Sequence, residues 1–590
     1  MVKISNPIIW ADVPDNDVIR VGDAFYMVST SMHSTPGGPI MKSYDLQHWE
    51  IVSYIFETLN DKDGNNLENG CSIYGQGSWA ASLRYVDGWY YCLFNCNDDH
   101  CAYMFRTRDI EASNWEKHRL SRFLHDPGLL IDDDGRKYVL YGNNDIYIVE
   151  LTEDMLDFKP GGLDRLLFTT EQENIGLKAE GCHAYKIAGT YYAIFIEWPT
   201  DGHARRREVC YRWTDFNGPV EHRVILDDDM RYHNAGIAQG AIFTLPGGGA
   251  DVDASQQTGS GDADAGLRAV RGLKSSLGEY VMSPGPDGAL WAALLFQDHG
   301  AVGRIPYVMP VEWRDGWPMP GIDGYVPEWV ELPIEARTES DSLSESLHAE
   351  GRIFTREDLH RGEPDPYSES AVAGNHMQPG YGLVASDDFR RIRGQETCLA
   401  DVRHLWQWNH NPDNVAWSLT EREGWLRLVN LHLTERGILA ARNTLTQRTF
   451  GPHCTFATHL EFASLKNGDA AGMVAMQGQF GLVGVRAGEE GERTLVMCVN
   501  DGKYGEKVIA SEKLAPGRSD IYLKIEFDFE DNRDLAVFYR SFDGSRWKQV
   551  GRPLAMKYTL DHFMGYRVGL YSYATEQTGG YADFEWFRVE

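Results

Sequence analysis

Five stretches of the chain share one pattern, a glycine turn followed by an almost unbroken run of apolar and aromatic residues. Consecutive turn glycines are separated by 66, 47, 54 and 99 residues, and they are Gly22, Gly88, Gly135, Gly189 and Gly288. A turn plus a buried strand, repeated about every 50 residues, is typical of the blades of a β-propeller. The pattern therefore predicts five blades. Five unrelated hairpins are the alternative, which the aromatic position shared by the copies disfavours.

The last interval is too long by about one blade. The surplus lies at residues 247–283, where Gly, Asp, Ser and Ala dominate and little can be buried, so we expect a flexible insertion there. Residues 331–385 are rich in Ser, Glu, Asp, Gly and Pro, which favours a linker. We therefore expect a propeller domain over residues 1–330, interrupted by the insertion, and a linker over residues 331–385.

Residues 386–590 carry a second all-β pattern. Apolar Ile521, Leu523 and Ile525 alternate with polar neighbours, as in a strand with one buried face. Asp543-Gly544 lies between two further strand-like runs and indicates a hairpin. About 200 residues of such strands fit a sandwich of two sheets. The predicted fold class is thus all-β, a five-bladed β-propeller followed by a β-sandwich of the jelly-roll or concanavalin-like type.

Composition and charge limit which binding partners and which cellular compartment we expect. The 590 residues include 56 Lys+Arg and 87 Asp+Glu, a net charge of −31, which disfavours nucleic acid and anionic membrane surfaces. No apolar run approaches the about 20 residues of a membrane span, and the first residues lack the apolar core of a secretory signal. We expect a cytoplasmic protein, or a secreted one whose signal has been removed. The nine cysteines show no zinc spacing and are expected to be reduced.

Three acidic residues stand at the starts of predicted blades. Asp15 precedes the first blade strand, Asp126 the third and Glu180 the fourth. Strand starts next to a propeller axis face one centre, so the three carboxyls are expected to converge. Inverting glycoside hydrolysis needs two separated carboxyls, and a third nearby raises the pKa of the acid by repulsion. The alternative is that these acids only bond the backbone of their turns.

The segments around these acids, with residues 79–85 and 303–307, resemble glycoside hydrolase family 43 over residues 1 to about 330. Residues 403–413 and 445–452 resemble the concanavalin-like sandwich of its two-domain members. The resemblance implies a five-bladed propeller that acts by inversion on arabinofuranosides and xylosides. It also implies that Asp15 is the general base, that Asp126 tunes and orients the acid, and that Glu180 is the general acid.

Further site residues follow from the same resemblance. Arg304 matches an arginine that binds sugar hydroxyls, and Trp79 is similar to an aromatic residue of the pocket wall. Gln239 stands where many members have a histidine over the central ion of the propeller, and Asn16 follows the base where the family often has proline. His33 follows the first blade strand and is expected either to line the pocket or to be a solvated loop residue.

No cofactor is expected for the chemistry, but a structural calcium ion is a candidate. Asp387 and Asp583, near opposite ends of the second domain, are its candidate ligands. The run Arg205-Arg206-Arg207 is interpreted as a solvated strand end rather than an anion site.

We therefore expect an exo-acting, inverting glycosidase whose substrate is arabinoxylan or a xylo-oligosaccharide. Residues 10–15 and 296–304 look most like the arabinofuranosidase branch of the family, so α-L-arabinofuranosidase is favoured. β-1,4-Xylosidase or dual activity is the close alternative. A propeller that binds glycans without cutting them is a second class, and a scaffold for protein partners is a third. Neither of these needs three acids at three blade entrances.

Overall fold

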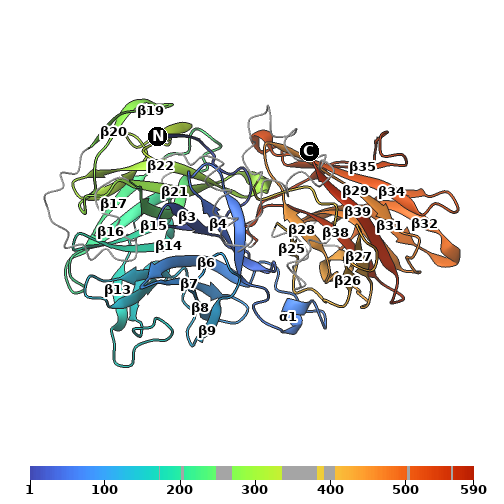
Figure 1. The fold of residues 1–590 in the computed structure, drawn as a ribbon, viewed down its shortest axis with the longest axis horizontal. Helices are drawn as coiled ribbons and strands as arrows, with labels where there is room; N and C mark the ends of the chain where they lie inside the picture. The colour runs from blue at the N-terminus through green and yellow to red at the C-terminus, as the bar shows by residue number, and fades with distance from the viewer. Residues whose placement is uncertain are drawn as a thin grey trace, which may run out of the picture.

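The structure is a computed structural model that describes residues 1–171, 173–200, 205–246, 269–334, 382–390, 405–500, 505–559 and 562–590. Two β-rich domains lie side by side, which confirms the predicted fold class (Figure 1). The described helices are short, namely α1 (Asp63–Asn66) and the 3-10 turns η1 (Gly300–Val302), η3 (Gly437–Ala440), η4 (Glu489–Gly491) and η5 (Glu530–Asn532). Within the described ranges, no helix is long and apolar enough to cross a membrane.

The first domain contains five antiparallel sheets of four strands each. The first sheet contains β2 (Asp17–Val21), β3 (Ala24–Val28), β4 (Gly37–Ser43) and β5 (Glu50–Phe56), and the second contains β6 (Ser78–Val86), β7 (Trp89–Cys96), β8 (Cys101–Thr107) and β9 (Glu116–Leu120). The third contains β10 (Gly128–Ile131), β11 (Lys137–Tyr141), β12 (Asp145–Glu150) and β13 (Asp164–Thr169), and the fourth contains β14 (Ile175–Ile187), β15 (Thr190–Pro199), β16 (Arg207–Trp213) and β17 (Glu221–Leu226). The fifth contains β18 (Ile237–Thr244), β21 (Trp291–Asp298), β22 (Arg304–Arg314) and β23 (Trp317–Pro320).

The first strands of these sheets form a ring. Strand β2 contacts β6, β6 contacts β10, β10 contacts β14, β14 contacts β18, and β18 returns to β2, which is the closed arrangement of a β-propeller. The turn glycines found in the sequence each precede the second strand of a sheet. All of them have positive φ, as in Gly22 at 59° and Gly88 at 77°, a conformation that glycine adopts without steric cost.

A sixth four-stranded sheet joins the two ends of this domain. Its order is β1 (Val2–Ser5), β24 (Trp329–Leu332), β19 (Val270–Ser275) and β20 (Gly278–Met282). The structure thus differs from the predicted insertion at 247–283, because residues 270–282 form a hairpin held by buried Leu273 and Met282. Residues 247–268, and most of the predicted linker, lie outside the described residues.

The second domain is a sandwich of two antiparallel sheets. One sheet contains, in order, β25 (Gln407–Trp408), β28 (Leu445–Arg448), β38 (Arg567–Ala574), β30 (Asp469–Met476), β31 (Phe480–Ala487), β32 (Arg493–Asn500) and β33 (Lys507–Lys513). The other contains β26 (Trp417–Ser418), β27 (Leu426–Val429), β39 (Tyr581–Val589), β29 (His453–Glu461), β34 (Asp520–Asp528), β35 (Leu535–Ser541) and β36 (Lys548–Gln549), with β37 (Leu554–Ala555) paired to β35. Strand β34 has the predicted alternation of buried and half-buried residues.

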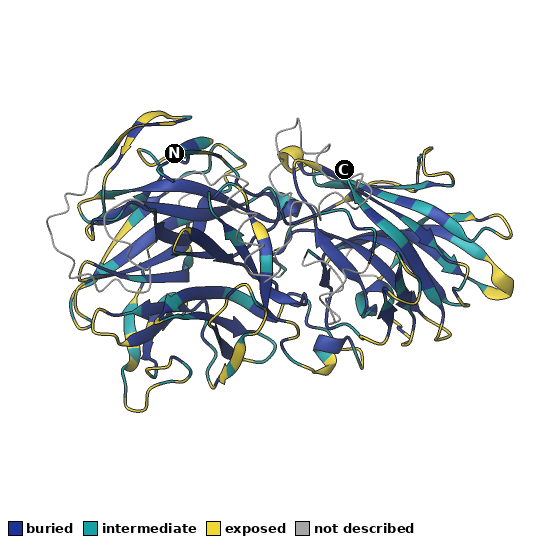
Figure 2. Cartoon of the chain, in the orientation of Figure 1, coloured by how far each residue is buried: buried dark blue, intermediate teal, exposed yellow. Residues whose placement is uncertain are grey.

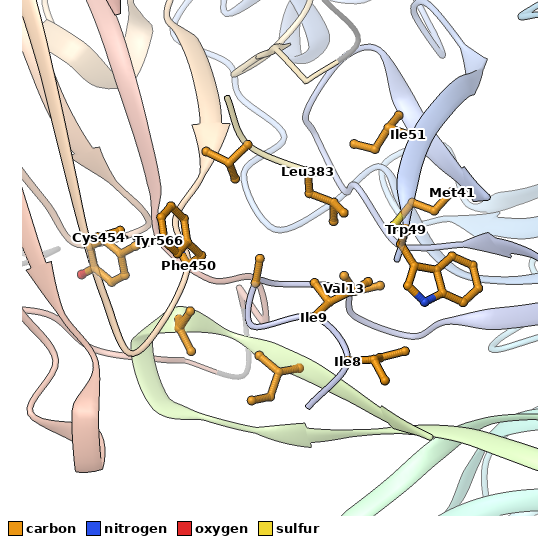
Figure 3. Packing of buried hydrophobic residues seen from close by; sticks show 14 of the residues in the cluster. Ile8, Ile9, Val13, Met41, Trp49, Ile51, Leu383, Phe450, Cys454 and Tyr566 are labelled. Carbon is orange, nitrogen blue, oxygen red and sulfur yellow. Dashed lines mark hydrogen bonds between the residues drawn. The ribbon is translucent and has the colours of Figure 1, made fainter. Parts of the chain in front are cut away.

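Buried residues continue through the contact between the two domains (Figure 2). Ile8, Ile9 and Val13, in the segment before the first blade, belong to one hydrophobic cluster with Phe450 and Tyr566 of the sandwich (Figure 3). Backbone hydrogen bonds also cross the contact, as residues 35 and 408 exchange two of 2.6 and 3.0 Å. The two domains therefore share one hydrophobic cluster and backbone hydrogen bonds at their contact.

Candidate active site

The three predicted acids come together at one end of the propeller ring. Asp15 and Asp126 lie just before β2 and β10, and both have left-handed backbone conformations with φ of 51° and 45°. Glu180 lies within β14, where the pairing with β15 shifts register on both sides of it. Residues held in such uncommon backbone conformations cluster at functional sites. Burial raises the pKa of Asp126 to about 6, and the charges of Glu180 and Asp15 add to this effect.

Asp15 is buried and both of its carboxylate oxygens are held. Oδ1 accepts a hydrogen bond of 2.5 Å from Nη1 of Arg304, and Oδ2 accepts one of 2.8 Å from the hydroxyl of Thr30. The arginine thus places a positive charge against the carboxylate, and the two contacts fix its orientation. This placement suits a group that must take a proton from one particular water molecule.

Asp126 and Glu180 share a partner that the sequence analysis did not single out. Asp126 Oδ2 accepts a hydrogen bond of 3.1 Å from the backbone N–H of Gly181. Nε2 of His125 lies 3.3 Å from Glu180 Oε2 and 3.7 Å from Asp126 Oδ2. The charge of Asp126 and the hydrogen bond to Glu180 raise the pKa of His125 to about 9, against the opposing effect of burial. A histidine beside an aspartate in a turn has no spacing that marks it in a sequence.

Arg304 connects the propeller site to the sandwich domain. Its Nε donates to the hydroxyl of Tyr558 at 2.9 Å and to Oδ1 of Asp298 at 3.2 Å. The Tyr558 hydroxyl also donates to the same carboxylate at 3.2 Å. The guanidinium carbon lies 4.5 Å from the ring centre of Phe563, a second residue of the sandwich. Sequence reasoning missed Tyr558 because it is 254 residues from Arg304 and belongs to another domain.

Arg206 also belongs to this region, contrary to the interpretation of residues 205–207 as a solvated strand end. Its side chain is 4% exposed, and Nη2 lies 3.1 Å from Oδ2 of Asp298. The carboxylate of Asp298 therefore bridges two arginines, Arg206 and Arg304. Neighbouring Arg205 follows the prediction better, since it pairs with Asp227 nearer the surface. Arg206 lies just before β16 and is the one buried member of the run, which the charge pattern alone did not indicate.

Trp79, the predicted residue of the pocket wall, lies beside Phe563 of the sandwich. Its ring packs edge-on against Phe563 with centroids 5.1 Å apart, and its Nε1 donates to the carbonyl of Gly75 at 3.1 Å. Tyr558 and Met564 belong to the same small hydrophobic cluster, so both domains contribute to it. The contact of Trp79 with substrate remains a prediction.

His33 and Gln239 occupy different surroundings. His33 is buried at the domain contact, with its ring 4.9 Å from those of Tyr74 and His410, so it is not a solvated loop residue. Gln239 lies at a bulge in β18 with φ of 64°, and its backbone N–H donates to Oε2 of Glu208 at 2.7 Å. Its side chain packs against the backbone of Gly181, next to Glu180. Their roles in substrate binding remain predictions.

The predicted calcium ligands are each held by protein groups. Asp583 is paired with Arg427 at 2.8 Å and with Arg422 at 3.1 Å, and Asp387 accepts a hydrogen bond from the indole of Trp406 at 3.0 Å. Two arginines supply the positive charge that an ion would bring to Asp583. The geometry therefore gives no support to calcium at Asp387 and Asp583.

At the propeller ring, Asp17 pairs with Arg84 at 2.8 Å and with His183 at 3.3 Å. These three side chains come from strands β2, β6 and β14, so they meet across the ring. The cation beside this carboxylate is an arginine, so these three residues give no support to a calcium ion at the ring. The described cysteines, eight in number, are all free thiols.

A propeller with acids at three blade entrances, bordered by a β-sandwich, has the architecture of a two-domain glycoside hydrolase. The family model for glycosyl hydrolases family 43 matches residues 4–266, and the model for the beta xylosidase C-terminal concanavalin A-like domain matches residues 400–590. The chain belongs to glycoside hydrolase family 43.

Similar proteins have xylosidase and arabinofuranosidase names. A beta-xylosidase of Formosa agariphila is 25% identical over 99% of this chain and 90% of its own length. A non-reducing end alpha-L-arabinofuranosidase of Bacteroides ovatus is 26% identical over 72% of this chain and 64% of its own.

Several solved structures match the whole chain, and two of them are more than 25% identical to it. A bifunctional GH43-CE protein of Bacteroides eggerthii has 36% identity and a TM-score of 0.78, and this chain spans 63% of it. A GH43 enzyme engineered to display both endo-xylanase and exo-arabinofuranosidase activity has 26% identity and a TM-score of 0.74, with 99% of it covered.

Proposed function

We propose that the protein is an inverting exo-glycosidase that removes terminal pentoses from arabinoxylan-type oligosaccharides, with α-L-arabinofuranosidase as its main activity. The observation that carries this proposal is the convergence of Asp15, Asp126 and Glu180 from three blades beside Arg304. Tyr558 and Phe563 of the sandwich border the same site, which favours the binding of a chain end over the binding of a chain interior.

The chemistry assigns one carboxyl to each face of the sugar. Asp15 takes a proton from a water molecule that attacks the anomeric carbon, while Glu180 gives a proton to the glycosidic oxygen as the bond breaks. Inverting enzymes keep these carboxyls about 6.5–9.5 Å apart to leave room for the water. Within the described residues, Asp15 and Glu180 share no hydrogen bond, and each has its own basic partner, Arg304 and His125. The proposal of inversion rests on the likeness of the acidic segments to family 43.

Asp126 has a supporting role in this scheme. Its buried carboxyl, with a pKa raised to about 6 by burial and the neighbouring acids, is largely ionised at neutral pH. A negative charge beside Glu180 favours the protonated state that a general acid needs. The hydrogen bond from Gly181, the residue after Glu180, ties the two carboxyl-bearing segments together.

β-1,4-Xylosidase, alone or as a dual activity, is the second candidate. Relatives that match 99% and 94% of the chain are called a beta-xylosidase and a putative beta-xylosidase. Arabinofuranose and xylopyranose present similar hydroxyls, so one site can accept both. The preference for arabinofuranosides rests on the likeness of the segments around Asp15 and Arg304 to that branch of the family.

The test compares 4-nitrophenyl α-L-arabinofuranoside, 4-nitrophenyl β-D-xyloside and arabinoxylan as substrates, with Asp15→Asn protein as the background control. Faster release from the arabinofuranoside, and free arabinose from arabinoxylan, are the expected results. Release from the xyloside alone would transfer the assignment to β-xylosidase. Proton NMR of the first-formed sugar is expected to show inverted configuration, and retention would overturn the mechanism. Binding of arabinoxylan without any hydrolysis would favour the glycan-binding alternative.

A further inference from the structure

His125 occupies the space between two of the three acids, in a fixed orientation. Its Nε2 faces Glu180 Oε2 at 3.3 Å and Asp126 Oδ2 at 3.7 Å. The ring lies against Phe123 with a centroid distance of 6.4 Å and an interplanar angle of 29°. The His125 carbonyl accepts a hydrogen bond of 2.9 Å from the backbone N–H of Gly142, which anchors the loop. The imidazole side chain is 24% exposed, so solvent reaches part of it.

The charges that face this imidazole are mainly negative. Asp126 and Glu180 contact it directly, and Asp15 lies beyond Asp126 with its own partner Arg304. Asp126 and the hydrogen bond to Glu180 raise the pKa of His125 to about 9. While Glu180 is ionised, as it is after each turnover, the imidazolium form of the ring is therefore favoured, with its N–H facing the proposed general acid.

An inverting turnover leaves both catalytic carboxyls in the wrong protonation state. Asp15 has gained a proton and Glu180 has lost one, so the next turnover must wait until both are reset. Asp15 must pass its proton on to solvent. Glu180 must regain a proton, and among the hydrogen bonds and ion pairs of the described residues its carboxylate contacts only His125, which solvent partly reaches.

We propose that His125 is a positioning residue that holds Oε2 of Glu180, so that Oε1 faces the leaving group, and that it returns a proton to Glu180 after each turnover. This inference rests on the proposed function, since it takes Glu180 as the general acid. The Nε2 proton moves to Glu180 Oε2, the imidazolium becomes neutral imidazole, and a proton from bulk water restores it. The proton that Asp15 releases balances this uptake, so the net reaction stays the hydrolysis of one glycosidic bond.

The test uses His125→Gln, which retains an N–H donor but cannot transfer its proton. Rates are compared on an arabinoxylan oligosaccharide and on an aryl glycoside whose leaving group departs without protonation. We expect kcat on the oligosaccharide to fall about 10–100-fold with little change in KM, and kcat on the activated aryl glycoside to stay within about 3-fold. Added imidazole is expected to restore part of the oligosaccharide rate.

Two further variants distinguish a failure of the proposed function from a failure of the role proposed for His125. Glu180→Ala tests the underlying proposal, because loss of the general acid must also spare the activated substrate. If Glu180→Ala affects both substrates equally, the proposed function fails. If Glu180→Ala discriminates between them but His125→Gln does not, the role of His125 is overturned. His125→Asn, with a shorter amide, checks the result if the glutamine variant folds poorly, and rescue by imidazole would show that the fold of either variant is intact.

Discussion

Buried histidines at the domain contact make the stability of this protein depend on pH. His33 and His410 have ring centroids 4.9 Å apart, and the ring of His562 lies 5.1 Å from His33. Burial lowers the pKa of His410 to about 3 and that of His33 well below its usual value, and the neighbouring histidines add to both effects. Above the unfolded pKa of 6.5 such a histidine is mainly neutral in both states, and its contribution to the stability of the fold is fully present. As the pH falls below 6.5, the unfolded chain takes up a proton that the folded protein does not, and this stability is lost.

The size of the effect follows from linkage. A histidine that titrates near 6.5 when unfolded and near 3 when folded loses about 2 kcal/mol of stabilisation between pH 7.5 and pH 5. The lowered pKa of His33 adds to this loss in the same direction. The about 2 kcal/mol from His410 alone is already a large part of the 5–15 kcal/mol typical of a folded domain. Stability falls because the buried contact disfavours a charged imidazolium in the folded state, whereas the same histidine in the unfolded chain is free to take up a proton.

Urea denaturation followed by tryptophan fluorescence at pH 7.5, 6.5 and 5 measures this dependence. In His410→Gln the difference in unfolding free energy between pH 7.5 and pH 5 is expected to shrink by about 2 kcal/mol, whatever the absolute stability of the variant. His100→Asn is the matched control, since His100 is exposed and asparagine tolerates its φ of 47°. An unchanged pH dependence in His410→Gln would refute the reasoning.

Three further predictions concern turnover. Asp15→Asn should keep the fold, seen by circular dichroism, and lower kcat by at least about 100-fold, because an amide takes no proton from water; activity within a few-fold of the parent contradicts the assignment. Asp126→Asn should move the basic limb of the pH profile of kcat/KM to lower pH, and an unchanged profile would make Asp126 purely structural. Tyr558→Phe removes a hydroxyl that contacts Arg304 and Asp298, and should lower kcat/KM about 10-fold or more, whereas Tyr539→Phe on the outer face of the sandwich should not.

The sequence was most informative where local conformation dictated the residue. Each predicted turn glycine has positive φ just before the second strand of a sheet. Because this conformation favours glycine, the repeated glycines marked the blades in the sequence. The acids Asp15, Asp126 and Glu180 were found because each stands at the same place in its own blade. By contrast, the hairpin at 270–282 was missed because only Leu273 and a few neighbours are apolar in a polar stretch.

The unpredicted part of the site depends on long-range packing. Tyr558 reaches Arg304 across a domain boundary, and no periodicity connects two residues 254 positions apart. His125 was visible in the sequence, but its meaning depends on the distance from its ring to Glu180. Arg206 was hidden within a run of three arginines, because a charge pattern does not reveal which member of the run faces inward.

Strand β1 has a consequence for how the ring stays closed. All strands of the first sheet come from residues 17–56 and those of the last from residues 237–320, so no strand is shared between them. Residues 2–5 instead pair with residues 329–332, beyond the last sheet. The short segment that carries Asp15 is thus tethered at both ends, upstream by β1 and downstream by β2. Such a tether reduces the conformational freedom of the base before any sugar binds, so part of the entropic cost of assembling the site is met during folding.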